Sequence, residues 1–120
     1  MSDLPTLDEF LTSSKPSSMS RAYVREPGFK ELYVRHTIHF IERKKVPTID
    51  IARVEATTTG QSTFKNLIAR LRRDYPNDTI YIESVLTDRF AEGLLRMGFK
   101  PFPYHDNCFY LPVGKTLNAS

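Results

Sequence analysis

The chain has 120 residues, of which 40% are hydrophobic and 26% are charged. These fractions are typical of one globular domain with a single core, and they argue against disorder of the whole chain. The formal net charge of +3 is compatible with an anionic ligand. It is too small to indicate nucleic-acid binding, which we do not expect.

Targeting signals and cysteine pairs are absent from the sequence. No hydrophobic run is long enough to span a bilayer, and residues 1–20 lack the apolar core of a signal peptide. The single cysteine, Cys108, has no partner for an internal disulfide and no metal-ligand spacing around it. We therefore expect a cytoplasmic protein with no membrane contact and no bound metal, in which Cys108 is a buried, inert thiol.

The N-terminal segment, residues 1–20, is rich in Ser, Thr and Pro. Leucine and phenylalanine side chains at helical spacing between residues 4 and 11 predict a short helix, and the Ser-rich stretch 13–18 reads as a linker. We expect residues 1–20 to form a tail and residues 21–120 to form the domain.

A Pro-Gly turn at residues 27–28 separates two β-prone segments, Arg21–Arg25 and Phe29–Ile41, and predicts a β-hairpin. Apolar and polar residues alternate along the second segment, as in a strand with one buried face. His36 falls on the apolar face and His39 on the polar face, so the two are not expected to share a ligand. We expect His36 to be a hydrogen-bonded core residue.

A charged loop at residues 42–45, ended by Pro47, is predicted to lead into a central strand, Ile49–Ala56. Strict alternation is expected to place Ile49, Ile51 and Arg53 on one face of this strand. Arg53 and Glu55 are charged and interrupt the apolar pattern at its carboxyl end. Either an ion pair holds them, or this end of the sheet opens into a cleft. Ligands of open α/β sheets bind beyond the carboxyl ends of strands.

An amphipathic helix, Thr63–Tyr75, is the clearest element of the sequence, because apolar residues recur from Phe64 at i, i+3, i+4 and i+7. Ser62 is expected to be its N-cap, and the turn before it has the character of an anion-binding helix start. Basic residues at 70, 72 and 73 are interpreted as favourable to the helix dipole rather than as a nucleic-acid patch.

The C-terminal half of the chain continues this β-α pattern. Alternating residues predict a strand, Thr79–Leu86, and an apolar stripe predicts a helix, Asp88–Met97, with Gly98 at its C′ position. Lys100–Tyr104 and Cys108–Val113 read as two short final strands, which their prolines restrict to edge or interrupted pairing. An α/β domain organised on a β-α-β-α unit follows.

Residues 30–112 resemble the GCN5-related N-acetyltransferase (GNAT) family in the order and length of their elements, and the chain is similar to small acetyltransferase-like proteins of bacteriophages. In that family a central strand leads into a turn, Gln/Arg-x-x-Gly-x-Gly/Ala, whose backbone N–H groups hold the pyrophosphate of acetyl-coenzyme A. Two features carry the resemblance. The central strand aligns on Val54 with the strand that precedes this turn, and the later segment from Thr87 ends in Gly98-Phe99 as in the family. The resemblance implies that the coenzyme contacts Val54, Thr59, Gly60, Gln61, Ser62 and Thr63.

The resemblance further implies a single α+β domain with a mixed, mostly antiparallel central sheet flanked by helices. The implied activity is transfer of an acetyl group from acetyl-coenzyme A to an amine of a small molecule or protein by direct attack. Such a reaction needs a base near the cleft, for which Glu55 and Glu83 are our candidates. Tyr104 or Tyr110 is expected to protonate the departing thiolate. Glu83 is also expected to form an ion pair with Arg35 or Arg53.

A second hypothesis follows from the positions at which the chain departs from the family pattern. Thr59, Ser62 and Phe64 stand where Gln or Arg, Gly, and Gly or Ala are usual. Leu94 stands where a tyrosine often serves as the acid, four residues before Gly98. These departures are those of a catalytically degenerate, GNAT-like binding protein. Such a protein of phage type would dock on a host protein in the host cytoplasm, or form a homodimer through its final strands.

Overall fold

The structure is a computed structural model that describes residues 4–57 and 61–113, without the side chains of residues 61 and 62. Its centre is a six-stranded sheet with the strand order β1-β2-β3-β4-β6-β5. The strands are β1 (Arg21–Tyr23), β2 (Phe29–Ile41), β3 (Lys44–Ala56), β4 (Thr79–Ile82), β5 (Lys100–Pro101) and β6 (Phe109–Leu111).

Only β3 and β4 pair in parallel, and the other neighbouring strands are antiparallel. The predicted fold class, an α+β domain with a mixed and mostly antiparallel sheet, is therefore confirmed. Two-residue turns can join antiparallel strands, but a parallel pair needs a long crossover. Helix α2 (Gln61–Asp74) supplies that crossover between β3 and β4.

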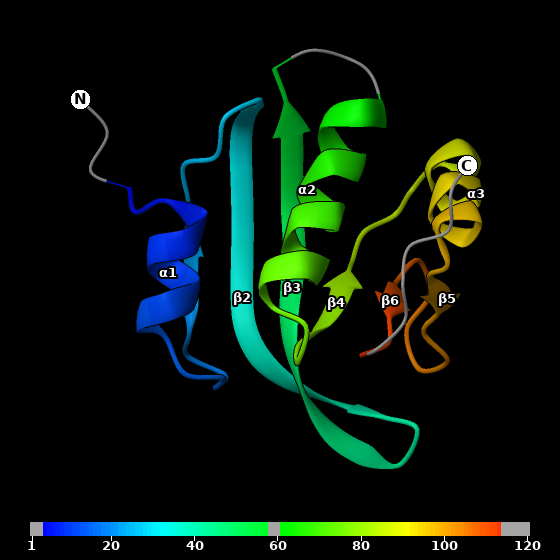
Figure 1. The fold of residues 1–120 in the computed structure, drawn as a ribbon. Coiled ribbons are helices and arrows are strands. Elements are labelled where there is room, and N and C mark those ends of the chain that lie inside the picture. Colours follow the sequence, from blue (N-terminus) through cyan, green and yellow to red (C-terminus); the bar gives the residue numbers. More distant parts are fainter. Residues whose placement is uncertain (1–3, 58–60, 114–120) are drawn as a thin grey trace.

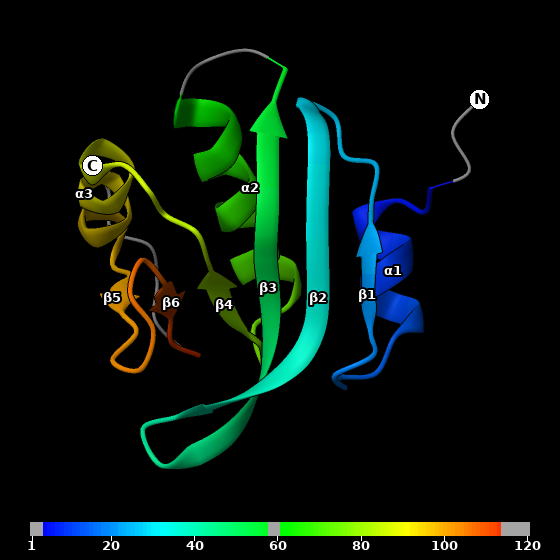
Figure 2. The same cartoon turned by 180° about the vertical axis from the view of Figure 1, so that it is seen from behind.

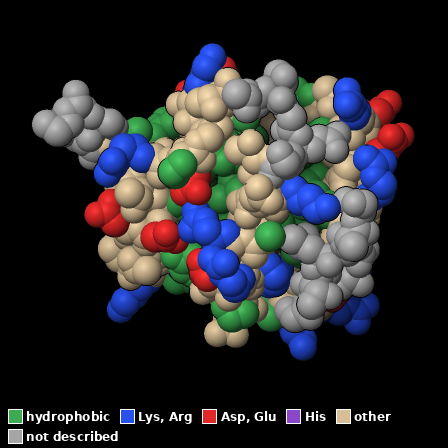
Figure 3. Space-filling view, turned by 45° about the horizontal axis from the view of Figure 1, so that its top comes forward, with side chains coloured by type: hydrophobic (Ala, Val, Ile, Leu, Met, Phe, Trp, Pro, Cys, Tyr) green, Lys and Arg blue, Asp and Glu red, His purple; other side chains and the backbone are tan. Residues whose placement is uncertain are grey.

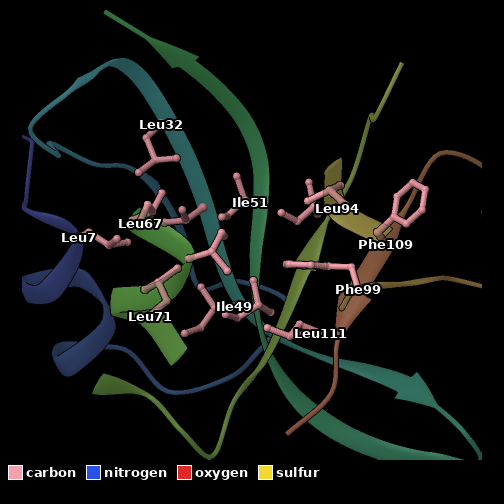
Figure 4. Packing of buried hydrophobic residues seen from close by; sticks show 14 of the residues in the cluster. Leu7, Leu32, Ile49, Ile51, Leu67, Leu71, Leu94, Phe99, Phe109 and Leu111 are labelled. Atoms are coloured by element: carbon pink, nitrogen blue, oxygen red, sulfur yellow. The ribbon is translucent and has the colours of Figure 1, made fainter. Parts of the chain in front are cut away.

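Three helices contribute to one hydrophobic cluster on one side of the sheet (Figures 1 and 2). They are α1 (Leu7–Ser13), α2 and α3 (Asp88–Met97). Figure 4 shows leucines from all three helices turned toward the isoleucines of β3. Because these side chains come from segments far apart in the sequence, the cluster joins both halves of the chain.

Helix α1 is built into this core. A reciprocal capping box starts it, in which Thr6 N donates to Glu9 Oε1 at 2.8 Å and Glu9 N donates to Thr6 Oγ1 at 3.1 Å. Leu7 is 0% exposed. On the outer side, Asp8 accepts hydrogen bonds from the guanidinium of Arg70 and the hydroxyl of Tyr75, each at 3.0 Å. Residues 4–14 are thus part of the domain's packing.

The predicted hairpin between β1 and β2 is confirmed, and Gly28 occupies the turn with φ +92°. His36 is confirmed as a hydrogen-bonded core residue, since it is 7% exposed and its Nδ1 lies 2.9 Å from Ser14 Oγ. Its Nε2 lies 3.6 Å from Asp78 Oδ2.

The predicted loop between β2 and β3 is wrong in extent. Only Glu42 and Arg43 form the turn, both with positive φ (51° and 67°), and β3 begins at Lys44. Positive φ at both central residues gives a turn whose twist matches the flanking strands, so the strands can pair up to it. Pro47 lies within the paired region, where it faces Ile38 in β2. Pairing of β3 with β4 starts only after it, and a proline is tolerated where one strand edge is free.

A β-bulge interrupts the alternation expected for β3. Tyr33 pairs with Arg53 and Val34 with Ile51, so Ala52 is an extra residue. The predicted grouping of Arg53 with Ile49 and Ile51 on one face is wrong for this reason. Val54 instead packs against the hydrophobic cluster beyond the bulge.

Other element boundaries differ from the prediction in definite ways. Helix α2 begins at Gln61, so Ser62 lies inside the helix and the prediction of an N-cap there is wrong. Strand β4 ends at Ile82, before Ser84 with its φ of +62°, and does not reach Leu86. Helix α3 has the predicted bounds, and Gly98 ends it with φ +107°. Both final strands exist, but they are shorter than predicted.

We expect Leu7→Ala to lower the free energy of unfolding by about 2–5 kcal/mol, because it removes a fully buried side chain from the main cluster. Chemical denaturation measures this change. Met19→Ala is the control, since Met19 is 76% exposed and its change should stay within about 0.5 kcal/mol. A loss for Leu7→Ala as small as that of the control would mean that α1 does not stabilise the domain.

Burial, followed by the hydrogen bond and charge of Asp8, raises the pKa of Tyr75 to about 12. An unfolded tyrosine loses its proton near pH 10, so the unfolded state ionises first as the pH rises from about 10 to about 12. The free energy of unfolding should therefore fall more steeply over this interval in the parent protein than in Tyr75→Phe. Tyr104→Phe, at an exposed tyrosine, should keep the parent slope in the same denaturation series. An identical slope for Tyr75→Phe would contradict the assignment.

Candidate functional site

The parallel strands β3 and β4 diverge at their carboxyl ends. Their last ladder pair is Ile51 and Ile82, followed by a hydrogen bond from Glu83 N to Ile51 O at 3.3 Å. Strand β3 then continues along β2 to Ala56, whereas Val85 N donates to Asn107 O at 2.9 Å. Figures 1 and 2 show the two segments separating toward the start of α2. A wedge-shaped opening in the sheet results.

A mainly apolar pocket of about 220 Å³ lies on the helix side of this opening. Strand β3, the first turns of α2 and one side of α3 enclose it. Its lining residues are Phe29, Val54, Ala56, Phe64, Lys65, Arg89, Phe90, Gly93, Leu94, Arg96 and Met97. The aromatic rings of Phe64 and Phe90 meet edge to face, with their centroids 5.2 Å apart, and join the two helices across it. We call it the apolar pocket.

Three of these lining residues, Lys65, Arg89 and Arg96, carry positive charge. Within residues 4–57 and 61–113, neither Arg89 nor Arg96 forms an ion pair, and both side chains are exposed. Figure 3, which brings this end of the molecule forward, shows hydrophobic surface between Lys and Arg side chains. The apolar pocket is therefore suited to a ligand with an apolar portion and an anionic portion.

A second, polar pocket of about 420 Å³ is formed beside the end of β4 by side chains that point away from the hydrophobic cluster. Its lining residues are His39, Tyr81, Glu83, Ser84, Leu86, His105, Asp106, Asn107 and Cys108. They come from β2, from β4 and the segment after it, and from the loop between β5 and β6. We call it the polar pocket. Of the predicted catalytic residues, Glu83 alone lines either pocket.

Glu83 forms the ion pair that the sequence analysis expected, with Arg35 as its partner at 3.0 Å. Burial acts against the charge of Arg35, but the charge and hydrogen bond of Glu83 outweigh it and raise the pKa of Arg35. The two side chains are 25% and 35% exposed. The Glu83 carboxylate is therefore held in place at the wall of the polar pocket.

Tyr81 lies beneath the same pocket and is 2% exposed. Burial first, then the neighbouring Cys108 and the charges of Asp50 and Glu83, raise the pKa of Tyr81 far above its ordinary value. Its phenol therefore stays protonated at neutral pH. Cys108 is partly buried rather than fully buried as predicted, and it lines the pocket while packing against a second hydrophobic cluster that contains Tyr81.

The remaining predicted catalytic residues lie elsewhere. The side chain of Glu55 is 61% exposed and its carboxylate lies 3.8 Å from Lys30 Nζ. Tyr104 is 63% exposed, and its ring meets Phe102 edge to face at 5.5 Å. Tyr110 is buried, and its hydroxyl donates to Glu42 Oε1 at 3.3 Å. Burial, and then the charge of Glu42, raise the pKa of Tyr110.

Of the residues predicted to bind the coenzyme, Val54 lines the apolar pocket. Thr63 packs over the turn between β1 and β2. A Cβ added to Gly28 in that turn would lie 2.8 Å from the methyl group of Thr63. Thr59 and Gly60, and the side chains of Gln61 and Ser62, lie outside the described residues.

The polar pocket also contains residues that the sequence analysis did not select, among them His39 and Tyr81. Tyr81 and Glu83 are two residues apart in a segment that the sequence predicts to be a strand, and this spacing alone places them on the same face. No comparable signal joins His39 to them, because it lies on a different strand far away in the chain.

No protein-family model matches the sequence, and no curated protein matches it. In the described part of the chain, no group of three or more His, Cys, Asp or Glu is placed to hold a metal ion. No described helix is long and apolar enough to cross a bilayer.

Asp50 lies on the face of the sheet that borders the polar pocket, and it is 1% exposed. Thr48, which is also buried, donates a hydrogen bond from Oγ1 to Asp50 Oδ1 at 2.6 Å. We expect Thr48→Val to lower the free energy of unfolding by about 1.5–3 kcal/mol, because a hydrogen bond to a charged group is lost without a change of shape. Thr79→Val is the control. Thr79 is its buried ladder partner on β4, and its hydroxyl makes no hydrogen bond with described residues. Equal losses in chemical denaturation would contradict this role of Thr48.

Proposed function

We propose that the protein binds acetyl-coenzyme A where β3 and β4 diverge and transfers its acetyl group to an amine. The observation that carries this proposal is the position of the apolar pocket. The pocket lies beside the opening between β3 and β4, the only parallel strand pair described. Helix α2 follows β3 directly in the chain, and three of the residues that line the pocket are basic. The resemblance of residues 30–112 to the GNAT family points to the same place.

The chemistry of the coenzyme fits this end of the sheet. Its phosphates complement Lys65, Arg89 and Arg96, and the backbone N–H groups at the start of α2 are further donors for an anion. Its thin, amide-containing arm fits an opening in which Arg53–Ala56 have no strand partner, among the described residues, on the side away from β2. The amides of such an arm are able to pair with these backbone groups.

In the proposed reaction an unprotonated amine attacks the carbonyl carbon of the thioester. The amine gives up a proton to a base, the C–S bond breaks, and the thiolate takes a proton from an acid. Of the two predicted bases, the position of Glu83 in the polar pocket favours it over Glu55. Tyr81 lines the polar pocket, whereas Tyr104 and Tyr110 line neither pocket, so its position favours Tyr81 as the proton donor.

The second candidate function is coenzyme or partner binding without catalysis, with a host protein or a second copy of the chain as the partner. Leu94 favours this second candidate. It stands at the position of the family's acid, is 0% exposed, and has no proton to donate to a thiolate. In either case we propose a cytoplasmic protein, in the host cytoplasm if a phage encodes it.

The proposal predicts thermal stabilisation by acetyl-coenzyme A that depends on Gly93. A saturating ligand at 100 times its Kd adds about 2.7 kcal/mol to the free energy of unfolding. Gly93 lines the apolar pocket, and a Cβ added there meets nothing within 4 Å. Gly93→Trp should therefore fill the pocket without disturbing the helix, and should abolish the shift in melting temperature.

Gly93→Ala is the matched control, because one methyl group leaves the pocket open. It should keep the shift, and alanine should also stabilise α3 by about 0.5–1 kcal/mol relative to glycine. No shift of the parent protein at millimolar acetyl-coenzyme A would refute the proposal. An undiminished shift in Gly93→Trp would place the coenzyme somewhere other than the apolar pocket.

A further inference from the structure

A buried histidine–aspartate pair lies at the wall of the polar pocket, and neither member has been given a role above. His39 Nε2 lies 2.7 Å from Asp50 Oδ2. The carboxylate is 1% exposed, whereas the imidazole is 24% exposed and lines the polar pocket. One member of the pair is thus buried and the other reaches the pocket.

The pair depends on the shape of the β2–β3 hairpin. In the ladder, His39 faces Val46 and Asp50 faces Arg35, so the two residues are not cross-strand neighbours. The hairpin bends across the sheet toward β6, as Figure 2 shows, and Ile41 near its tip packs with Tyr81 and Tyr110. This bend carries His39 over Asp50, and its ring stacks on Tyr81 with centroids 4.1 Å apart.

Asp50 determines which nitrogen of His39 is able to accept a proton. Its second oxygen is occupied by the hydroxyl of Thr48, so the carboxylate is fixed between two donors. When Nε2–H donates to Asp50, the neutral imidazole carries its lone pair on Nδ1. Among the described residues Nδ1 has no hydrogen-bond partner. By contrast, Glu83 in the same pocket already accepts a hydrogen bond from Arg35 on its Oε1.

We propose that His39, oriented by Asp50, takes the place of Glu83 as the general base that accepts the proton of the acceptor amine, and that the polar pocket is the amine site. This inference rests on the proposed acetyl transfer. The amine arrives as an ammonium ion, leaves one proton on Nδ1 of His39, and attacks the thioester as a neutral amine. As the C–S bond breaks, the nitrogen loses a second proton and the thiolate gains one. Asp50 acts as a positioning residue that stabilises the resulting imidazolium.

The charge of the pocket fits a cationic amine, because its lining includes two carboxylates and no lysine or arginine. The titratable or charged groups that face His39 come from three elements. They are Asp50 on β3, Tyr81 on β4 with Glu83 directly after it, and His105, Asp106 and Cys108 in the loop between β5 and β6.

The test compares two nucleophiles. Ethylamine is protonated at pH 7 and needs a base, whereas hydroxylamine is unprotonated at that pH and does not. His39→Gln should reduce acetyl transfer to ethylamine by at least about 100-fold, the usual contribution of a general base. Transfer to hydroxylamine and the stabilisation by acetyl-coenzyme A should be unchanged. The release of coenzyme A thiol measures both rates.

His36→Gln is the matched control, since it changes the same residue type in the same strand outside both pockets. It should retain both rates, with its fold checked by thermal melting. A second readout needs no turnover: the imidazole ¹⁵N spectrum of His39 should show the Nε2–H tautomer in the parent protein. In Asp50→Asn this preference should be lost, together with transfer to ethylamine.

The possible failures are distinguishable. Absence of any stabilisation by acetyl-coenzyme A would remove the proposed function and this inference with it. Coenzyme binding with equal ethylamine rates in the parent protein and His39→Gln would overturn the role of His39 alone. Coenzyme binding with no transfer to either amine would overturn it too, and would support the non-catalytic candidate. An Nδ1–H tautomer in the parent protein would also refute it.

Discussion

The single parallel contact between β3 and β4 is the constraint on which the rest of the molecule depends. A parallel pair cannot be joined by a tight turn, so the chain must cross over the sheet, and α2 makes that crossover while covering the isoleucines of both strands. The pair is also short. Once it ends at Ile51 and Ile82, β3 follows β2 and the chain after β4 follows the C-terminal loop. The opening between the two segments therefore results because each one pairs with a different neighbour.

The two sides of the sheet have different chemistry for a related reason. The helices bury one side in hydrocarbon, which leaves the alternate residues of β2, β3 and β4 on the other side. Several of those residues are polar, and they satisfy one another through the pairs Arg35–Glu83 and His39–Asp50. Buried polar groups persist only when they are paired, so this network also fixes the positions of side chains that border the polar pocket. The apolar pocket and the polar pocket, our proposed sites for the coenzyme and the amine, thus lie beside a single opening.

Local sequence was sufficient for several elements. The Pro27-Gly28 turn, the apolar stripe of α3 and its ending at Gly98 depend on residues close together in the chain, and they were predicted correctly. An ion pair of Glu83 was expected with Arg35 or Arg53, and the structure selects Arg35. The start of α2, the length of β4 and the facing of Arg53 were predicted wrongly. Each depends on a contact with a distant strand, or on a backbone change at one residue such as Ser84 or Ala52.

The sequence by itself determined which segments form strands and which form helices, because periods of two and of about 3.6 residues mark the faces that they bury. It also indicated where one pocket would be, at the end of the central strand. Only the tertiary structure decided which charged and polar side chains meet. His39 and Asp50 come together through the bend of a long hairpin, and Tyr81 lies beneath them because β4 pairs with β3 in one register. Such meetings depend on register and curvature, which arise from contacts between distant segments, and no short-range pattern in the chain encodes them.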